Sequence, residues 1–310
     1  MEELDIELLK EMGALTRQIR KEASKLIVEG ATDRQIIDYV EKKIFDLGYM
    51  PAFPCTVAVN DMAAHLTVFD REYTFKKGDL VKLDFGISKN GFCTDNATTI
   101  EIGTNTYETL RKANFEGLNA AFESIGEGVS MSKVGAAVDA VAQKYGFETI
   151  HNLSGHQIAK NNLHCGMNVP NYDNGDSRQA GDNMEFAIEP FFTVGQPKIK
   201  AAGPSHILHL ARDKAVRDPI AKKVLDHIKA RYPHLPFSKR WLLKEVMEKI
   251  KSTDPAGFDM RRVVYAVNLL KQQGILYEYE ALATVDKAMV SQFEDAIILK
   301  DGEKIIITRL

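Results

Sequence analysis

The stretch that decides the fold is DLVKLDFGISKNGFCTDNATTI, residues 79–100, which has the pattern of two apolar strands around a tight turn. Asn90-Gly91 favours a two-residue type I′ turn, because both central positions of that turn need a positive φ. Such a turn pairs Lys89 with Phe92 and sets the register of every pair behind them. The stretch therefore predicts a β-hairpin with a defined register.

Two aspartates lie inside this hairpin. The register sets Asp84 opposite Ala97 and Asp95 opposite Gly86, so the two carboxylates are diagonal neighbours within reach of a common centre. Gly86 leaves space for something that is not a side chain. A surface hairpin with two solvated aspartates is the alternative. Both strands are apolar on both faces, however, and this favours a buried site.

An internal repeat with an offset of 98 residues joins two parts of the chain. Its marks are two pairs of strings, Glu29-Gly30-Ala31-Thr32 with Glu127-Gly128-Val129-Ser130, and Leu47-Gly48-Tyr49 with Tyr145-Gly146-Phe147. Thr32 and Gln35 form a capping-box pattern, and Ser130 is the counterpart of Thr32. The repeat predicts two similar halves, each with a helix after its first string, although a chance similarity stays open for so short a match.

Each half continues to a Gly-Asp pair that opens an apolar strand, Gly78-Asp79 in the first and Gly181-Asp182 in the second. Asp84 follows the first of these glycines by six residues, and Glu189 follows the second by eight. Both offsets are even, so under regular alternation both carboxylates take the same face of their strands. Two halves related by a pseudo-two-fold axis would bring these carboxylates together.

Several short strings occur in order over nearly the whole chain: Pro51-Ala52-Phe53-Pro54, Ala63-Ala64-His65, Leu83-Asp84-Phe85-Gly86, Ser154-Gly155-His156, Leu163-His164, Ala187-Ile188-Glu189-Pro190 and Ser291-Gln292-Phe293-Glu294. In the order and spacing of these strings, the chain resembles the archaeal-type members of the type II methionine aminopeptidases, in peptidase family M24. The resemblance implies an α+β pita-bread fold of two pseudo-two-fold related α/β halves with a small winged-helix-like helical insertion. It also implies removal of the N-terminal methionine from nascent proteins and peptides.

The resemblance implies five metal ligands: Asp84, Asp95, His156, Glu189 and Glu294. Two carboxylates about 4 Å apart repel by roughly 4 kcal/mol at an effective dielectric near 20, so four together need cations. Two divalent ions would neutralise the four charges, whereas one would leave two charges uncompensated. Carboxylate oxygens with one imidazole suit Co, Mn, Fe or Zn. The expected cofactor is thus a pair of divalent ions, and the expected nucleophile is a water or hydroxide that they activate.

By the same resemblance His65 and His164 are catalytic histidines that also contact the substrate, and Glu189 is the proton shuttle. We expect His164 to polarise the scissile carbonyl group. Methionine selectivity needs an apolar pocket, and the candidate substrate-binding residues for it are Phe53, His206 and Tyr279. These three could equally be ordinary core or surface residues.

Composition is consistent with this class of enzyme. A chain of 310 residues can bury a large core, and a net charge of −3 gives no general sign of nucleic-acid or membrane binding. The three cysteines lack metal-type spacing and are typical of reduced thiols. An acidic start and the lack of an apolar run near 18 residues exclude a secretory signal and a membrane span. We expect a cytoplasmic monomer whose partners are N-terminal Met peptides, nascent chains and the ribosome.

Residues 196–283 break the repeat and are predicted to be the insertion, while residues 1–195 and 284–310 form the catalytic domain. Helical patterns cover Ala211–Tyr232, Lys239–Ser252 and Met260–Gly274. From residue 212 to residue 271 there are 15 lysines and arginines against 7 aspartates and glutamates. A basic winged helix is one basis for nucleic-acid binding. We favour a helical flap that shapes one wall of the cleft, with Trp241 in its core.

Two other classes of protein remain as alternatives. A proline-specific dipeptidase of the same fold would carry an additional N-terminal domain, for which this chain has no room before Asp84. A non-catalytic relative that binds ribosomes or RNA would lack one or more metal ligands, and here all five are present. Metal analysis and a peptide assay separate the three classes.

Overall fold

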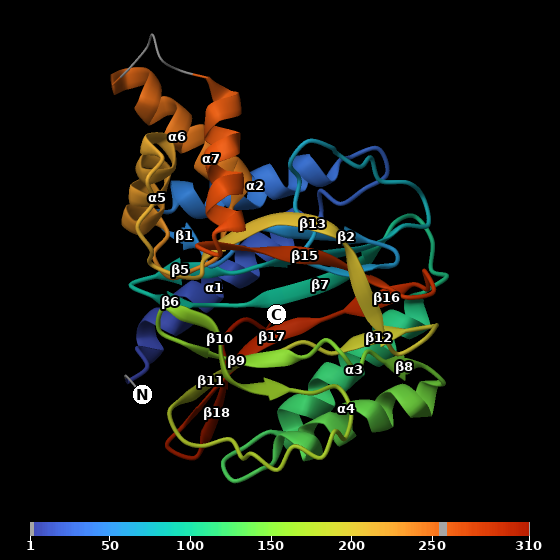
Figure 1. The fold of residues 1–310 in the computed structure, drawn as a ribbon. Helices are drawn as coiled ribbons and strands as arrows, with labels where there is room; N and C mark the ends of the chain where they lie inside the picture. The colour runs from blue at the N-terminus through green and yellow to red at the C-terminus, as the bar shows by residue number, and fades with distance from the viewer. Residues whose placement is uncertain (1–2, 254–258, 310) are drawn as a thin grey trace. The chain divides into compact units, whose positions relative to one another are not determined.

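The computed structural model describes residues 3–253 and 259–309 and forms two compact units, Met1–Gly203 with Ala281–Leu310, and Pro204–Glu280. The first unit is built on an eight-stranded sheet in the order β10-β9-β11-β17-β7-β4-β2, with β18 also paired to β17 (Figure 1). Its strands are β2 (Thr56–Val59), β4 (Leu80–Phe85), β7 (Asn96–Glu101), β9 (Gly155–Ala159), β10 (Asn162–Val169), β11 (Met184–Ile188), β17 (Glu294–Lys300) and β18 (Glu303–Ile306).

Two helix pairs supply the core around this sheet. Helices α1 (Ile6–Ser24) and α2 (Asp33–Asp46) contribute to one apolar cluster, which includes Val81, Leu83 and Phe85 of β4. Helices α3 (Glu108–Ser124) and α4 (Met131–Tyr145) contribute to a second cluster with strands β11 and β17. Each helix pair thus has its own apolar cluster, and β17 contributes side chains to both.

The structure confirms the internal repeat in detail. Thr32 caps α2 in a capping box with Gln35, and Ser130 occupies the same position before α4 without a side-chain bond. Gly30 N donates to Phe75 O in the first half, and Gly128 N donates to Ala180 O in the second. The two strings therefore precede equivalent helices and meet equivalent loops, as two pseudo-symmetric halves require.

The hairpin of residues 79–100 has the predicted register but is divided between two sheets. Lys89 pairs with Phe92 in the small sheet, and Asp84 pairs with Ala97 in the large one. Between them a Cβ added at Gly86 would lie 2.0 Å from Thr94 O. The space beside Gly86 is thus filled by a backbone carbonyl, and this close approach marks where the chain passes from one sheet to the other.

Three smaller sheets complete the chain, in the orders β1-β5-β6, β16-β12-β8 and β14-β13-β15-β3. Their strands are β1 (Met50–Pro51), β3 (Met62–Ala64), β5 (Ile87–Lys89), β6 (Phe92–Cys93), β8 (Glu148–Thr149), β12 (Phe191–Thr193), β13 (Ile199–Leu210), β14 (Phe237–Ser238), β15 (Leu276–Thr284) and β16 (Val290–Gln292). β13 leads the chain from the first unit into the second, and β15 leads it back.

The second unit contains α5 (Pro219–Arg231), α6 (Lys239–Thr253) and α7 (Met260–Gln272). The helix predicted over Ala211–Tyr232 is wrong at its start: it begins only at Pro219, where Asp218 accepts hydrogen bonds from two backbone amides as the N-cap. Proline suits that position because its fixed φ matches the first helical turn. The predicted domain division at 196 and 283 stays a prediction.

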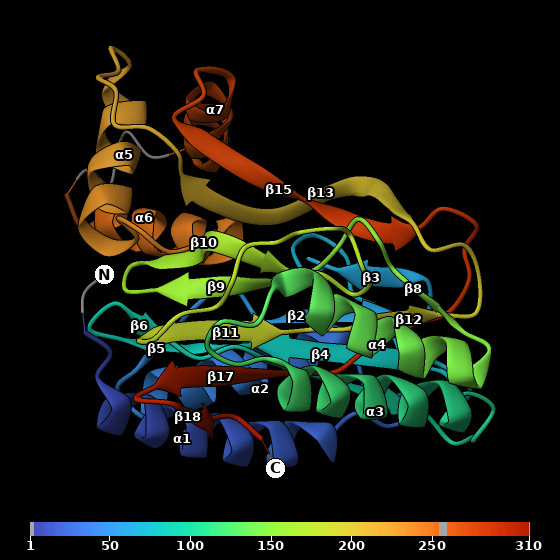
Figure 2. The same ribbon diagram turned by 90° about the horizontal axis from the view of Figure 1, so that it is seen from below.

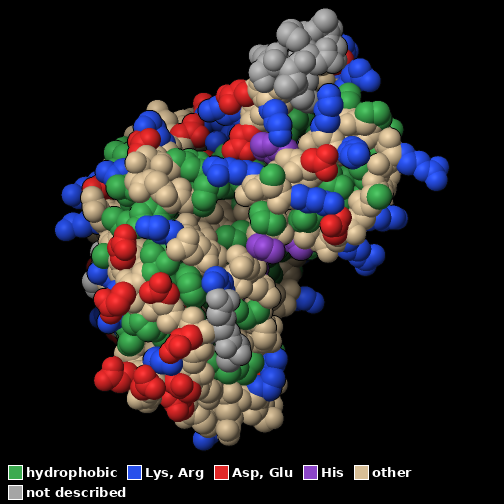
Figure 3. All heavy atoms as spheres, turned by 90° about the vertical axis from the view of Figure 1, so that its left-hand side faces the viewer, with side chains coloured by type: hydrophobic (Ala, Val, Ile, Leu, Met, Phe, Trp, Pro, Cys, Tyr) green, Lys and Arg blue, Asp and Glu red, His purple; other side chains and the backbone are tan. Residues whose placement is uncertain are grey.

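The core of the second unit is aromatic. The rings of Tyr232 and Phe237 stack with centroids 4.8 Å apart, and Trp241 is only 7% exposed. Trp241 is therefore a core residue, as predicted. Lys and Arg side chains are spread around this unit, at the upper right of Figure 3, among apolar and neutral groups. Among residues 3–253 and 259–309, no helix has the length and apolar character that crossing a membrane requires.

Candidate metal centre

The five predicted metal ligands all belong to the large sheet or to the residue next to one of its strands. Asp84 lies in β4 and His156 in β9, Glu294 opens β17, Asp95 directly precedes β7, and Glu189 directly follows β11. Strand pairing sets their places, because Ala97 of β7 pairs with Asp84 on one side and with Glu294 on the other. Asp84 and Glu294, 210 positions apart in the sequence, thus lie on the two strands that flank β7.

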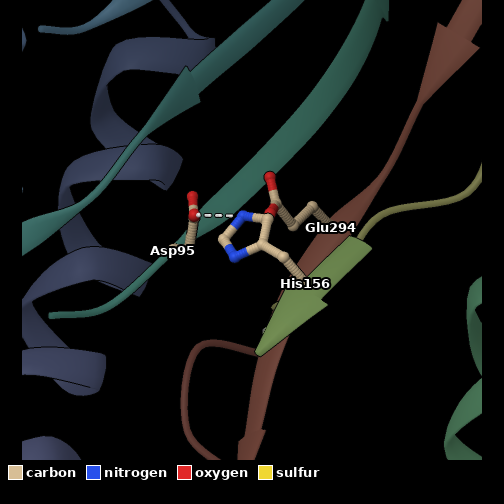
Figure 4. A group of neighbouring side chains, drawn as sticks. All are labelled: Asp95, His156 and Glu294. Carbon is tan, nitrogen blue, oxygen red and sulfur yellow. Dashed lines mark ion pairs between the residues drawn. The ribbon is translucent and has the colours of Figure 1, made fainter. Parts of the chain in front are cut away.

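Asp95, His156 and Glu294 form the centre of the group (Figure 4). Each is buried and offers one ligand atom, and these three atoms all lie within 4.8 Å of one another. His156 Nε2 lies 3.5 Å from Asp95 Oδ2 and 3.9 Å from Glu189 Oε1. One imidazole nitrogen therefore faces two carboxylates from different halves of the sheet, and Glu294 faces the same space.

Electrostatics connects the remaining carboxylates to this centre. Burial raises the pKa of Asp84 well above its usual value, and the charge of Asp95 raises it further. Burial, followed by the charges of Asp95 and Asp84, does the same to the pKa of Glu189. The pKa of Glu294 is also raised well above its usual value, first by burial and then by its carboxylate neighbours. Carboxyl groups buried this close together ionise readily only when a positive charge lies among them.

The donor set fits divalent cations. Asp84 Oδ1 is buried and has no hydrogen-bond partner among the described residues. Orphaned buried acceptors are costly unless a ligand or ion satisfies them. Buried oxygen donors together with a single imidazole are a ligand set that suits divalent metal ions.

Gln292 is a functional residue that sequence reasoning did not identify. Its Nε2 donates to Glu189 Oε2 at 3.2 Å, and its hydrogen bond also lowers the pKa of Asp84 against the effect of burial. The backbone of Gln292 is fixed in turn, because its N–H donates to Thr99 Oγ1 at 2.9 Å. The string Ser291-Gln292-Phe293-Glu294 contained the signal, since Gln292 is a polar residue only two positions before Glu294.

The two predicted catalytic histidines have different surroundings. His164 is exposed on β10, and its ring lies 4.3 Å from the ring of His156 in an edge-to-face arrangement. His65 directly follows β3, after two buried alanines, and has a φ of 59°. A non-glycine residue in this left-handed region costs about 1–3 kcal/mol, and such residues cluster at functional sites.

The three predicted pocket residues are divided between the units. Phe53 is buried in the first unit, where its ring edge would lie 3.0 Å from a Cβ at position 86. His206 and Tyr279 belong to the second unit. There His206 Nδ1 lies 3.5 Å from Glu278 Oε1, and the carbonyl oxygen of Tyr279 accepts a hydrogen bond from a serine hydroxyl. Their role in binding methionine stays a prediction.

A curled antiparallel sheet that carries buried carboxylates and an imidazole is the architecture of a metal-binding protein. The chain belongs to metallopeptidase family M24, whose model matches residues 7–217. It is 36% identical to a methionine aminopeptidase of Thermococcus onnurineus over 96% of this chain and 97% of that protein. A methionine aminopeptidase of Pyrococcus abyssi is 34% identical over 98% of this chain and 100% of its own length.

A solved structure supports the same fold. The methionine aminopeptidase of Thermotoga maritima matches with a TM-score of 0.66 and 20% identity, over 97% of this chain and 95% of that one. The predicted pita-bread fold is thereby confirmed. The full-length matches to curated relatives confirm the predicted class of enzyme, a methionine aminopeptidase.

Proposed function

We propose that this enzyme removes the N-terminal methionine from nascent proteins and peptides by hydrolysis of the first peptide bond at a dinuclear metal centre. The observation that carries the proposal is the buried group Asp95, His156 and Glu294, whose ligand atoms lie within 4.8 Å of one another. It occurs in a chain that aligns over its full length with methionine aminopeptidases.

Asp84, Asp95, His156, Glu189 and Glu294 would hold the two ions. Their four carboxylates balance the charge of two divalent cations. Burial and neighbouring negative charge raise the pKa values of Asp84, Glu189 and Glu294, so a positive charge among them is favoured. When bound, a pair of divalent ions supplies an activated water nucleophile and polarises the scissile carbonyl. The metal is one of Co, Mn, Fe or Zn.

Glu189 is the group that we assign to proton transfer. It lies beside His156, and Gln292 holds its Oε2. A carboxyl group oriented in this way can take the proton of the attacking water and deliver it to the leaving amine. The assignment requires that the scissile bond lies next to Glu189.

His164 and His65 are assigned to the substrate. His164 is exposed beside His156, so its ring can donate to the carbonyl oxygen as negative charge develops there. His65, held in a strained conformation after β3, would contact the substrate backbone and assist proton transfer. Phe53 would line the apolar pocket for the methionine side chain, and His206 and Tyr279 are further substrate-binding candidates.

The peptide assay separates this proposal from a proline-specific dipeptidase. We expect hydrolysis of Met-Ala-Ser, with release of methionine and two metal ions per chain, and negligible hydrolysis of the dipeptide Met-Pro. Preferential hydrolysis of Met-Pro would support the dipeptidase. A protein that is folded, free of bound metal and inactive on both peptides would support a non-catalytic relative.

In this proposal the second unit recruits no specific nucleic acid. Its basic residues are interspersed with apolar and neutral side chains, and its tryptophan is buried. RNA binding with a steep salt dependence, lost when Lys239 and Arg240 are neutralised, would overturn this view. We further propose that the enzyme acts in the cytoplasm as a monomer, on nascent chains at the ribosome; its three cysteines are free thiols.

A further inference from the structure

The C-terminal end of the described chain is held tightly against α1 in the first unit. After β18, Ile307 N donates to Ala296 O at 2.9 Å, and Arg17 of α1 donates to Ile307 O at 2.5 Å. A Cβ added at Gly13 would lie only 2.0 Å from Ile307 O, so this glycine permits the close approach. Figure 2 shows β18 and the chain end close to α1.

Arg20, seven residues and two helical turns beyond Gly13, reaches further into the same region. Its Nη1 donates to Asp295 Oδ1 at 2.8 Å and to Glu294 O at 3.3 Å, and its Nη2 donates to Thr308 O at 2.8 Å. Arg20, Asp295 and Thr308 are 4%, 2% and 0% exposed, so water does not compete for these bonds. One guanidinium group thus joins α1, β17 and the chain end.

The hydroxyl group of Thr308 completes the network. It accepts a hydrogen bond from Ala296 N at 2.8 Å. Its own proton faces Asp295 Oδ1 at 3.0 Å and the backbone oxygen of Asp95 at 3.4 Å. Arg20 and Thr308 together therefore contact the backbones of Asp95 and Glu294, two members of the buried metal-binding group.

A buried ion pair lies beside the metal group. Asp295 directly follows Glu294, and Arg20 Nη1 lies 2.8 Å from Asp295 Oδ1. Arg20 is therefore the charge partner of Asp295 as well as a donor to the backbone of Glu294.

We propose that Arg20 and Thr308 are positioning residues of the metal centre: they fix the backbone at Asp95 and Glu294 so that both side chains meet the same cations. This inference rests on the proposed function, because it takes Asp95 and Glu294 as ligands. Groups that orient metal ligands typically change metal affinity or activity by about 10–100-fold when they are removed. The affinity for metal is therefore the quantity to measure.

The experiment titrates Mn²⁺ into the metal-free full-length protein by calorimetry and compares variants at one pH. We expect Thr308→Val, which keeps the shape and removes the hydroxyl, to weaken Mn²⁺ binding by about 10-fold or more. Arg20→Met should weaken it by up to about 100-fold. Thr308→Ser restores the hydroxyl and should bind within about threefold of the unmodified protein, which a role in packing alone would not produce.

Arg17→Met is the matched control. Arg17 lies on the same helix and holds the same C-terminal segment, but its bond goes to Ile307 and to neither ligand residue. We expect this variant to melt at a lower temperature and to bind Mn²⁺ with unchanged affinity. An equal loss of affinity in Arg17→Met would mean that any loosening of the segment is enough, and would overturn the positioning role.

A double variant separates positioning from charge. Arg20→Met combined with Asp295→Asn removes both members of the ion pair, so no uncompensated charge remains. Positioning predicts that the double variant still binds Mn²⁺ weakly, because the bonds to Glu294 O and Thr308 O are absent. Full recovery of affinity would show that Arg20 acts only by cancelling Asp295, and would overturn the proposal.

Asp95→Asn distinguishes failure of this inference from failure of the proposed function. If Asp95→Asn loses Mn²⁺ while Thr308→Val and Arg20→Met bind it normally, the ligand assignment holds and the positioning role is wrong. If Asp95→Asn binds Mn²⁺ normally, the ligand assignment is wrong, and the inference fails with it. Should Arg20→Met not fold, the pair Thr308→Val and Thr308→Ser decides the question alone.

Discussion

Replacement of Asp95 by asparagine is the sharpest single test of the metal centre. The substitution keeps the shape of a side chain that is 3% exposed and removes one negative charge. A carboxylate and a divalent ion about 4 Å apart attract by roughly 8 kcal/mol at an effective dielectric near 20. About half of this lost attraction is offset, because the asparagine no longer repels a neighbouring carboxylate at a similar distance. A net loss of about 4 kcal/mol corresponds to roughly 10³-fold weaker metal binding.

The assay measures metal content after dialysis and hydrolysis of Met-Ala-Ser in the same preparation. We expect Asp95→Asn to retain less than two ions per chain and to be inactive. The matched control is Asp33→Asn, because Asp33 is also buried but accepts its hydrogen bonds from backbone amides of α2 and the loop before β4. Near-full activity with full metal loading in Asp95→Asn would refute the assignment of ligands.

Three further outcomes are expected. His65→Ala and His164→Ala should each lower kcat/KM by roughly 10²-fold, with metal content near two per chain; loss of metal would make the histidine a ligand. Burial raises the pKa of Glu278, but hydrogen bonds from its cationic neighbours lower it to about 2. Its ionised form therefore stabilises the fold above pH 4.5, and this contribution is lost as the pH falls toward 2. Glu278→Gln should flatten the fall of the unfolding temperature over that range, and an unchanged profile would contradict the reasoning. Gly13→Ala should destabilise the protein by about 1–3 kcal/mol in urea, because its Cβ would overlap Ile307 O.

The part of the site that could be predicted from the sequence depends on local rules. Asn90-Gly91 set the register of the hairpin, and through it the pairing of Asp84 with Ala97. The repeat placed equivalent glycines before equivalent helices. Periodicity and turn chemistry act within about twenty residues, and over that range the sequence was informative. The assignment of His156 and Glu294 to the same group depended on the family resemblance.

The division of the hairpin between two sheets could not be predicted in the same way. Gly86 was interpreted as space beside a carboxylate, and the structure fills that space with Thr94 O. A glycine in a strand indicates a close approach, but the sequence does not say what approaches. The start of α5 was missed for a related reason: apolar spacing extended the pattern to residue 211, whereas Asp218 and Pro219 fix the first turn.

The network around Arg20 lies beyond any local rule. The bond from Arg20 to Thr308 spans 288 residues, and the bond from Arg20 to Asp295 spans 275. An arginine in an amphipathic helix is ordinarily expected on the solvent side, and a threonine near the end of a chain has no distinctive pattern. Only the fold shows that Arg20 and Thr308 are buried and that their side chains donate to the backbone of metal-site residues.

This arrangement follows from the topology of the sheet. Asp95 precedes β7 and Glu294 opens β17, and these two strands pair only at Ala97 with Glu294 and Asn96 with Asp295. So short a ladder leaves the backbone beside both carboxylates with few strand hydrogen bonds of its own. Residues from the two ends of the chain supply the missing bonds, Arg20 to Glu294 O and Thr308 to Asp95 O. Strand pairing thus places the ligands, and hydrogen bonds from segments outside the sheet hold the backbone of two of them at this short junction.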